Sequence, residues 1–254
     1  PSVNGEFDLS WPMRLSERNG RSSCAKIHGL GGVGINLTPN EYWAHAEKFN
    51  PGHFEPEKML SAAREAGFTY AVLTTKHHDG FALWPSEYGG FSTKNYMHGR
   101  DLVGGYISAC RKTGMKVGLY YSPPDWYFTR RYCNFGFSSD KFYDTDLKEV
   151  PSRQPTAQEK AEYNEFIHGQ VTELLTKYGK IDLLWFDGET PAETPFTLEY
   201  IRGLQPSIVL NNRIGFGDYI TPEGQFPNRR PDGWWEECHC LNIGGWGYRS
   251  HEIY

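Results

Sequence analysis

The chain has 254 residues, with 26 Lys and Arg against 31 Asp and Glu, and a formal net charge of −5. This acidic balance argues against a nucleic acid or an anionic membrane surface as a partner. A composition that is 38% hydrophobic and 15% aromatic excludes a disordered chain and a coiled coil. No apolar run approaches the roughly 18 residues that a membrane span needs.

The N-terminal segment differs in composition from the rest of the chain. Residues 1–30 have few periodic apolar positions and are rich in Ser, Arg, Gly and Asn, which is typical of an arm wrapped around a domain. The segment lacks an initial Met and the basic-then-apolar layout of a signal peptide, so we expect a processed or trimmed chain. Five cysteines are an odd number, which leaves their disulfide state open.

Regular elements are predicted from residue 32 onward. A short apolar run at 32–37 is the first predicted strand. A helix is predicted over 56–66, because Pro56 suits its first turn and Gly67 ends it. The apolar segment 68–75 then reads as a buried strand.

The same helix and strand unit recurs along the chain. Further helices are predicted at 101–111, about 156–178 and about 195–204, and further strands at 115–121, 181–186, 207–211 and 239–243. Such alternation indicates an α/β protein with a parallel sheet.

Polar clusters follow four of these strands, at 76–79, 122–126, 187–189 and 212–213. Because the carboxyl ends of the strands of a closed barrel converge on one face, this pattern favours a (β/α)8-like TIM barrel over an open sheet. Six strands are predicted, so either two are missed or the chain ends before the barrel closes. The glycines at 29–32 precede an apolar run, which is not the layout of a dinucleotide fingerprint.

The side chains after the strands suit a sugar site. Such a site needs a stacking aromatic, hydrogen-bond donors and two carboxylates in different environments. This set is supplied by Trp185, His77, His78, Arg213, Asp187 and Glu223. Asp187 and the following glycine also fit an ordinary turn, and only the neighbouring clusters favour chemistry.

A metal site is the alternative interpretation of His77 and His78. Adjacent residues at the end of an extended strand point to opposite sides, so both rings reach one ion only if the chain turns. Cys238 and Cys240 flank a histidine, but no second pair at zinc spacing accompanies them. We therefore expect substrate hydrogen bonding by the histidines and no metal.

Seven segments carry a resemblance to a known family. They are TTKHHDGFALWPS from Thr74, GLYYS from Gly118, LWFDG from Leu184, NNR from Asn211, TPE from Thr221, and WEEC from Trp235 followed by WGY from Trp246. In this order they resemble the α-L-fucosidases of glycoside hydrolase family 29. The resemblance covers about residues 40 to 248.

The resemblance implies a retaining exo-glycosidase that needs no metal or organic cofactor and removes terminal α-L-fucose from glycans. Asp187 would be the nucleophile. Glu223 would be the general acid/base, with Glu236 as its rival and Asp218 as a distant third. A retaining mechanism requires carboxyl groups roughly 5–5.5 Å apart.

Other positions are carried over from the same motifs. His77 and His78 would bond sugar hydroxyls, Tyr121 and Trp185 would line the pocket, and Glu41 would be a further ligand. Arg213 is expected closer to Asp187 than to Glu223, because an arginine favours the ionised form of a carboxyl group.

The first strand departs from the family pattern. Either His28 keeps the family's sugar-binding histidine, or Asn36 lies near its place. An altered ligand leaves room for α-L-galactose, since a pocket that accommodates a methyl group excludes an added hydroxyl only weakly.

The resemblance also sets expectations for organisation and location. We expect one catalytic barrel over residues 1–254, without the family's C-terminal β-sandwich, and a secreted, periplasmic or lysosomal compartment. Two other functions are weighed: a glycan-binding protein that lacks turnover, and a metal-dependent hydrolase that uses His77, His78 and Asp187.

Overall fold

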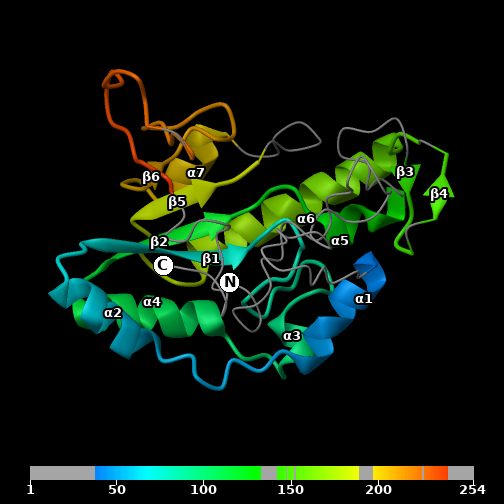
Figure 1. Ribbon diagram of the computed structural model, residues 1–254, viewed down its shortest axis with the longest axis horizontal. Coiled ribbons are helices and arrows are strands. Elements are labelled where there is room, and N and C mark those ends of the chain that lie inside the picture. Colours follow the sequence, from blue (N-terminus) through cyan, green and yellow to red (C-terminus); the bar gives the residue numbers. More distant parts are fainter. Residues whose placement is uncertain are drawn as a thin grey trace, which may run out of the picture.

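The computed structural model describes residues 38–132, 142–146, 148–151, 153–188, 197–224 and 226–239. Its centre is a four-stranded sheet in which every strand is parallel to its neighbours, in the order β1-β2-β5-β6. The strands are β1 (Tyr70–Lys76), β2 (Lys116–Tyr121), β5 (Leu183–Phe186) and β6 (Val209–Leu210). Because the strands are parallel, their carboxyl ends lie along one edge (Figure 1).

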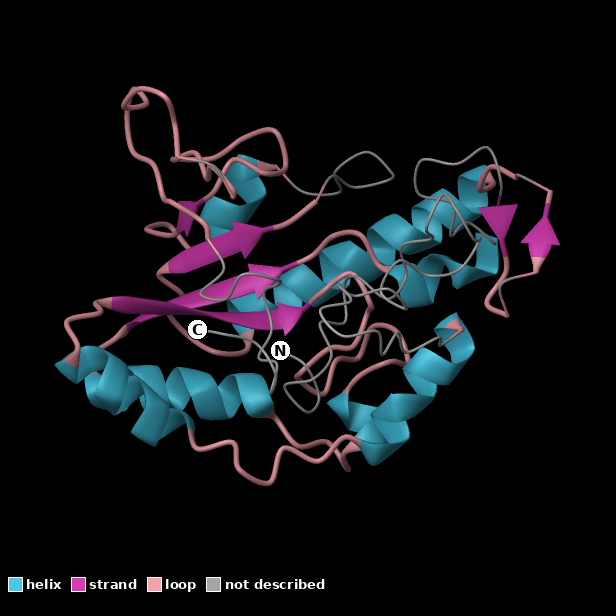
Figure 2. Ribbon diagram, viewed as in Figure 1, coloured by secondary structure: helices cyan, strands magenta, loops and turns pink. Residues whose placement is uncertain are grey.

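Helices connect the strands and cover the sheet (Figures 1 and 2). The helices α2 (Pro56–Glu65) and α4 (Leu102–Thr113) pack on each other, and α4 also packs against β1 and β2. The longer helix α6 (Ala157–Thr176) leads into β5, and it packs against α7 (Leu198–Leu204). None of the helices in the described ranges is long and apolar enough to cross a membrane.

Short elements complete the described structure. They are α1 (Pro39–Trp43), a 3₁₀ helix at Ala44–Lys48, α3 (Thr93–Tyr96), α5 (Trp126–Thr129), a 3₁₀ turn at Arg130–Tyr132, and the antiparallel pair β3 (Phe142–Tyr143) and β4 (Glu149–Val150). The periodicity predicts none of them, because segments of two to five residues are too short to carry a period.

Local signals explain where the long helices begin and end. The Asp101 carboxylate accepts from the Gly104 amide at the start of α4, and Gly114 closes α4 with φ +71°. Thr156 and Glu159 form a capping box at the start of α6. The helices and strands predicted between residues 56 and 211 are confirmed, with small shifts at their ends. The predicted strand at 32–37, the arm at 1–30 and nearly all of the strand at 239–243 lie outside the described residues.

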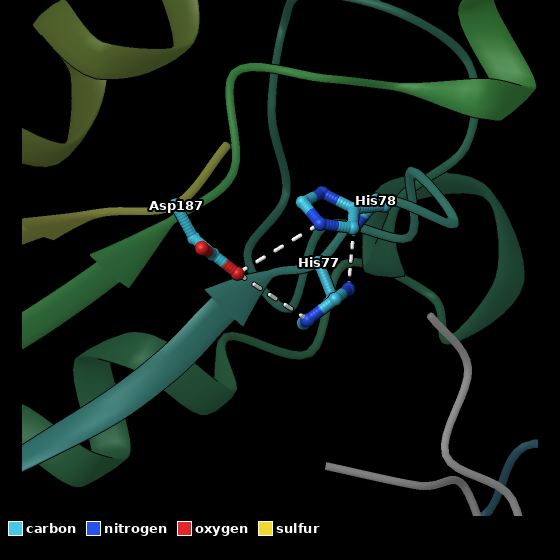
Figure 3. A group of neighbouring side chains, drawn as sticks. All are labelled: His77, His78 and Asp187. Atoms are coloured by element: carbon cyan, nitrogen blue, oxygen red, sulfur yellow. Dashed lines mark hydrogen bonds and ion pairs between the residues drawn. The ribbon is translucent and has the colours of Figure 1, made fainter. Parts of the chain in front are cut away.

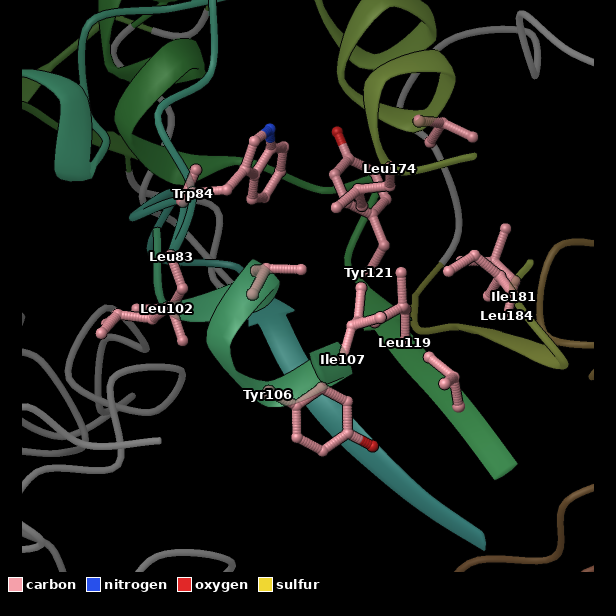
Figure 4. Packing of buried hydrophobic residues seen from close by; sticks show 14 of the residues in the cluster. Leu83, Trp84, Leu102, Tyr106, Ile107, Leu119, Tyr121, Leu174, Ile181 and Leu184 are labelled. Carbon is pink, nitrogen blue, oxygen red and sulfur yellow. The ribbon is translucent and has the colours of Figure 1, made fainter. Parts of the chain in front are cut away.

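The larger of two apolar clusters in the described residues joins the sheet to its helices (Figure 4). Leu119 of β2 and Leu184 of β5 are fully buried, and so is Ile107 of α4. Gly118 allows β1 to approach, since a Cβ there would lie 2.6 Å from the Ala71 carbonyl oxygen. The core therefore fixes the strands that present the site.

Candidate active site

Four strands direct their following residues to one place at the carboxyl edge of the sheet. Asp187 follows β5, and His77 and His78 follow β1. Tyr120 is the last residue but one of β2, and Arg213 follows β6. The sheet thereby brings together residues that are up to 136 positions apart in the sequence. Figure 3 shows three of them, His77, His78 and Asp187.

The two histidines face the same carboxylate because the chain turns directly after β1. The Gly80 amide donates to the His77 carbonyl oxygen at 3.0 Å, which closes this turn. Nε2 of His77 and Nε2 of His78 lie 3.9 and 3.7 Å from Oδ2 of Asp187 (Figure 3). Adjacent histidines on an extended strand would point to opposite sides, and this turn is what lets both rings reach Asp187.

The hydrogen bond at Nδ1 sets the protonation of His77. Nδ1 of His77 lies 2.7 Å from the His78 amide, and a backbone N–H can only donate, so Nδ1 is the acceptor. Burial, and then the neighbouring His78, lowers the pKa of His77 well below 6.5. The ring is thus neutral at pH 7 and carries its hydrogen on Nε2, the atom that faces Asp187.

The same geometry bears on metal binding. Within the described residues, His77, His78 and Asp187 form a group whose ligand atoms lie within 4.8 Å of one another. A metal ion needs a nitrogen lone pair, yet Nε2 of His77 carries a hydrogen. Moving that hydrogen to Nδ1 would break the bond from the His78 amide. The arrangement suits hydrogen-bond donation better than metal ligation.

Tyr120, and not Tyr121, lies in this cluster. The Tyr120 hydroxyl donates to Oδ2 of Asp187 at 2.6 Å. Tyr121 is fully buried and donates to Gln170 of α6. The expectation that Tyr121 lines the pocket is corrected, because neighbouring residues of a strand face opposite sides of the sheet.

Arg213 bridges two carboxylates. Its Nη1 lies 2.7 Å from Oε2 of Glu223 and 3.4 Å from Oδ1 of Asp187, so these two oxygens are at most about 6 Å apart. Nε and Nη2 of Arg213 donate to the hydroxyl and carbonyl oxygens of Thr221. The expectation that Arg213 lies closer to Asp187 is wrong. Thr221 holds the guanidinium, and Thr221 stands only two residues before Glu223 in the chain.

Trp185 packs between two groups that contact Asp187. Its ring stacks on Tyr120 at a centroid distance of 5.3 Å, and the Arg213 guanidinium carbon lies 4.9 Å from its centroid. Its indole Nε1 donates to Oε1 of Glu236 at 2.9 Å. The other oxygen of Glu236 accepts from the Tyr70 hydroxyl, and burial followed by Glu236 raises the pKa of Tyr70 to about 12.

The remaining predicted site residues either make other contacts or lie outside the described residues. Glu41 is exposed, and its carboxylate accepts from the Thr38 amide in the capping box of α1. Asp218 pairs with Arg202 and accepts from the Leu210 amide, so its carboxylate serves to hold β6. His28 and Asn36 lie outside the described residues. The role of Glu41 as a sugar ligand stays a prediction.

Sequence reasoning missed Tyr120 and placed Ser122 in the polar cluster at 122–126 without giving it a role in the site. The Ser122 hydroxyl contacts Nδ1 of His78. Both residues stand in the GLYYS segment. Alternation along the strand from the apolar Leu119, which is expected to face the core, would have placed Tyr120 on the opposite face.

Comparison with known proteins identifies the family. The sequence profile described as Alpha-L-fucosidase matches residues 34–254. The chain belongs to the alpha-L-fucosidase family. It is 36% identical to alpha-L-fucosidase 1 of Arabidopsis thaliana over 72% of its length, and 32% identical to the tissue alpha-L-fucosidase of Homo sapiens over 80%. The family resemblance read from the sequence is thereby confirmed.

Solved structures of the family share the fold. Isoenzyme 1 of the Paenibacillus thiaminolyticus alpha-L-fucosidase superposes with a TM-score of 0.70 and 35% identity over 84% of this chain. A Bacteroides thetaiotaomicron family 29 fucosidase, trapped as a covalent intermediate with 2-fluoro-fucosyl fluoride, superposes at 0.67 with 26% identity over 84% of this chain. These relatives support the predicted (β/α)8-like class, of which the described residues supply four parallel strands.

The chain spans only part of these family members. The matched region makes up 34% of the Arabidopsis protein, 43% of the human protein, and 54% and 52% of the two bacterial chains.

Proposed function

We propose that this chain hydrolyses terminal α-L-fucosyl residues of glycans with retention of configuration, and that Asp187 is the nucleophile. The observation that carries the proposal is the setting of the Asp187 carboxylate. Tyr120 donates to one of its oxygens and Arg213 to the other, which fixes the plane of the carboxylate. Its side chain keeps 21% of its surface exposed, so a sugar can reach it.

The reaction runs in two displacements. In the first, an oxygen of Asp187 bonds to the anomeric carbon, the glycosidic C–O bond breaks, and the leaving oxygen takes a proton from the general acid. In the second, water gives a proton to the same group and attacks the anomeric carbon, which releases the ionised Asp187. The neutral His77 is suited to donate to a sugar hydroxyl during both steps.

The acid must hold a proton when substrate arrives, and this requirement weighs against Glu223. Its Oε2 is already held in an ion pair with Nη1 of Arg213 at 2.7 Å. The described partners of Glu236 are neutral: the indole of Trp185 and the hydroxyls of Tyr70 and Tyr219. A hydroxyl can accept as well as donate, so it tolerates a protonated Glu236. We therefore assign the acid/base role to Glu236 and keep Glu223 as the second candidate.

Release of p-nitrophenol from its α-L-fucoside tests the assignment. Asp187→Asn should abolish turnover while circular dichroism shows an intact fold, and near-normal activity in this variant would exclude Asp187. The loss of activity in Glu236→Ala should be greatest for substrates with poor leaving groups, and azide should partly restore the activity. If Glu223→Ala is rescued instead, the assignment of the acid is wrong.

Two rival functions give different results in the same experiments. A glycan-binding protein without turnover would bind L-fucose in a titration but release no p-nitrophenol. A metal-dependent hydrolase would lose its activity on chelation. Parallel assays with the aryl α-L-galactoside measure how far the site tolerates a hydroxyl on C6. A secreted, periplasmic or lysosomal location follows from the proposed role alone.

A further inference from the structure

A buried ion pair lies directly beneath the two histidines. Nζ of Lys76, the last residue of β1, is 3.0 Å from Oδ2 of Asp125, and their side chains are 0% and 1% exposed. The ammonium group also lies 4.5 Å from the centroid of the Tyr121 ring. Neither charged group can touch a sugar bound at the exposed edge, so any role in the reaction is indirect.

Stability alone does not account for the pair. Removing two charges from water costs several kcal/mol for each ion, and an apolar pair of similar volume is often as stable or more stable. A buried pair does fix the distance and direction between the segments that carry it. The relevant question is which segments this pair joins.

The pair joins the histidine turn to the segment after β2. The Ser122 amide donates to the Lys76 carbonyl oxygen at 3.0 Å, and the Trp126 amide donates to the His78 carbonyl oxygen at 2.7 Å. His77 and His78 are therefore held between these two bonds, with the ion pair Lys76–Asp125 below them.

Asp125 is itself fixed from two further sides. Its Oδ1 accepts from the Phe128 amide at 2.7 Å and so caps α5. Gly80, which ends the histidine turn with φ +94°, packs so closely that a Cβ would lie 2.4 Å from the same oxygen. The position of the histidine turn is therefore limited by its close contact with the Asp125 carboxylate, and a shift of Asp125 would displace the turn.

We propose that Lys76 and Asp125 form a positioning pair that holds the imidazoles of His77 and His78 against Asp187. The proposal rests on the proposed fucosidase function for its effect on rate, but its effect on the histidine rings stands independently. A misplacement of about 1 Å at a reacting centre can cost about a hundredfold in rate. We expect loss of the pair to lower kcat/KM by about tenfold to a hundredfold.

The double variant Lys76→Met with Asp125→Asn separates positioning from stability. It leaves no unpaired buried charge, and the Asn oxygen can still accept from the Phe128 amide. Leu60→Ala on α2 is the matched control, because Leu60 is a buried core residue and its loss lowers stability without touching the turn. Thermal unfolding, kcat and KM are measured for all three proteins, at a temperature where each is folded.

A second readout follows the rings directly. Nitrogen-15 shifts of the imidazoles report which ring nitrogen carries the hydrogen, and wild-type His77 should show it on Nε2. The double variant should show a mixed tautomer and reduced kcat/KM, whereas Leu60→Ala keeps both wild-type values. A double variant with wild-type kcat/KM and a wild-type tautomer would overturn the proposal.

Two complications have their own outcomes. If the double variant does not fold, Lys76→Met alone takes its place, and the same two results decide. If the wild type releases no fucose, the proposed function fails. The tautomer of His77 in the variant then decides the positioning role without any assay of activity.

Discussion

Replacing Tyr120 by Phe tests the central contact of the site. The substitution removes only the hydroxyl that donates to Oδ2 of Asp187 at 2.6 Å, and the ring stays between His77 and Trp185. A hydrogen bond to a charged group contributes about 1.5–3 kcal/mol. If this bond is maintained in the transition state, its loss lowers kcat/KM by roughly tenfold to a hundredfold or slightly more.

Tyr121→Phe is the matched control on the next residue of the same strand. It removes a hydroxyl that donates to Gln170 at 2.9 Å inside the core. An unsatisfied buried acceptor costs about 1–3 kcal/mol of folding free energy, so the melting temperature should fall while kcat/KM stays within about threefold of wild type. Both variants are assayed for p-nitrophenol release and for thermal unfolding.

The two variants should therefore show opposite patterns. Tyr120→Phe should lose activity with a nearly unchanged melting temperature, because its hydroxyl lies at the partly exposed site. Equal losses of kcat/KM in both variants, or a fully active Tyr120→Phe, would refute the placement of Tyr120 beside a catalytic Asp187.

Three further predictions concern the histidine turn and the possible binding of a metal to its histidines. Burial raises the pKa of Asp79 to about 7 from 3.8, so between about pH 4 and 7 the unfolded state alone loses this proton and stability falls as the pH rises. The amide oxygen of Asp79→Asn can accept the same backbone hydrogen bond. This variant should be more stable than wild type at pH 8, by at most about 4 kcal/mol, and should change little in stability at pH 4. An equal effect on the melting temperature at both pH values would contradict the buried, protonated carboxyl group. Gly80→Ala should lower both stability and kcat/KM, because its methyl group would clash with Asp125 in addition to the strain of a positive φ. The control is Gly67→Ala, at a position with φ +96° and no atom within 4 Å of an added Cβ. It should cost about 1–2 kcal/mol of stability and leave kcat/KM unchanged. Prolonged dialysis against EDTA should leave p-nitrophenol release unchanged, and restoration of a lost activity by zinc would instead favour the metal hydrolase.

Local signals made much of the fold predictable. The predicted helix over 56–66 was found as α2 at Pro56–Glu65, because a proline and a glycine mark its ends whatever surrounds it. The strand predicted at 115–121 was found as β2 at Lys116–Tyr121 for a similar reason, since its run of apolar residues is interrupted only by Lys116 and Gly118. Short elements such as α5 escaped prediction, because their conformation depends on contacts such as that of Asp125 with Lys76.

The sequence by itself determined the alternation of helices and strands and the family, and it made Asp187 the candidate for the nucleophile, since each of these depends on residue types and their spacing along the chain. Only the tertiary structure decided which of two adjacent tyrosines meets Asp187, because that depends on which face of β2 is turned toward the core. It also decided that Arg213 pairs more closely with Glu223 than with Asp187. Distances between side chains on different strands depend on how the sheet packs and how each loop is anchored, and residue spacing alone does not contain that information.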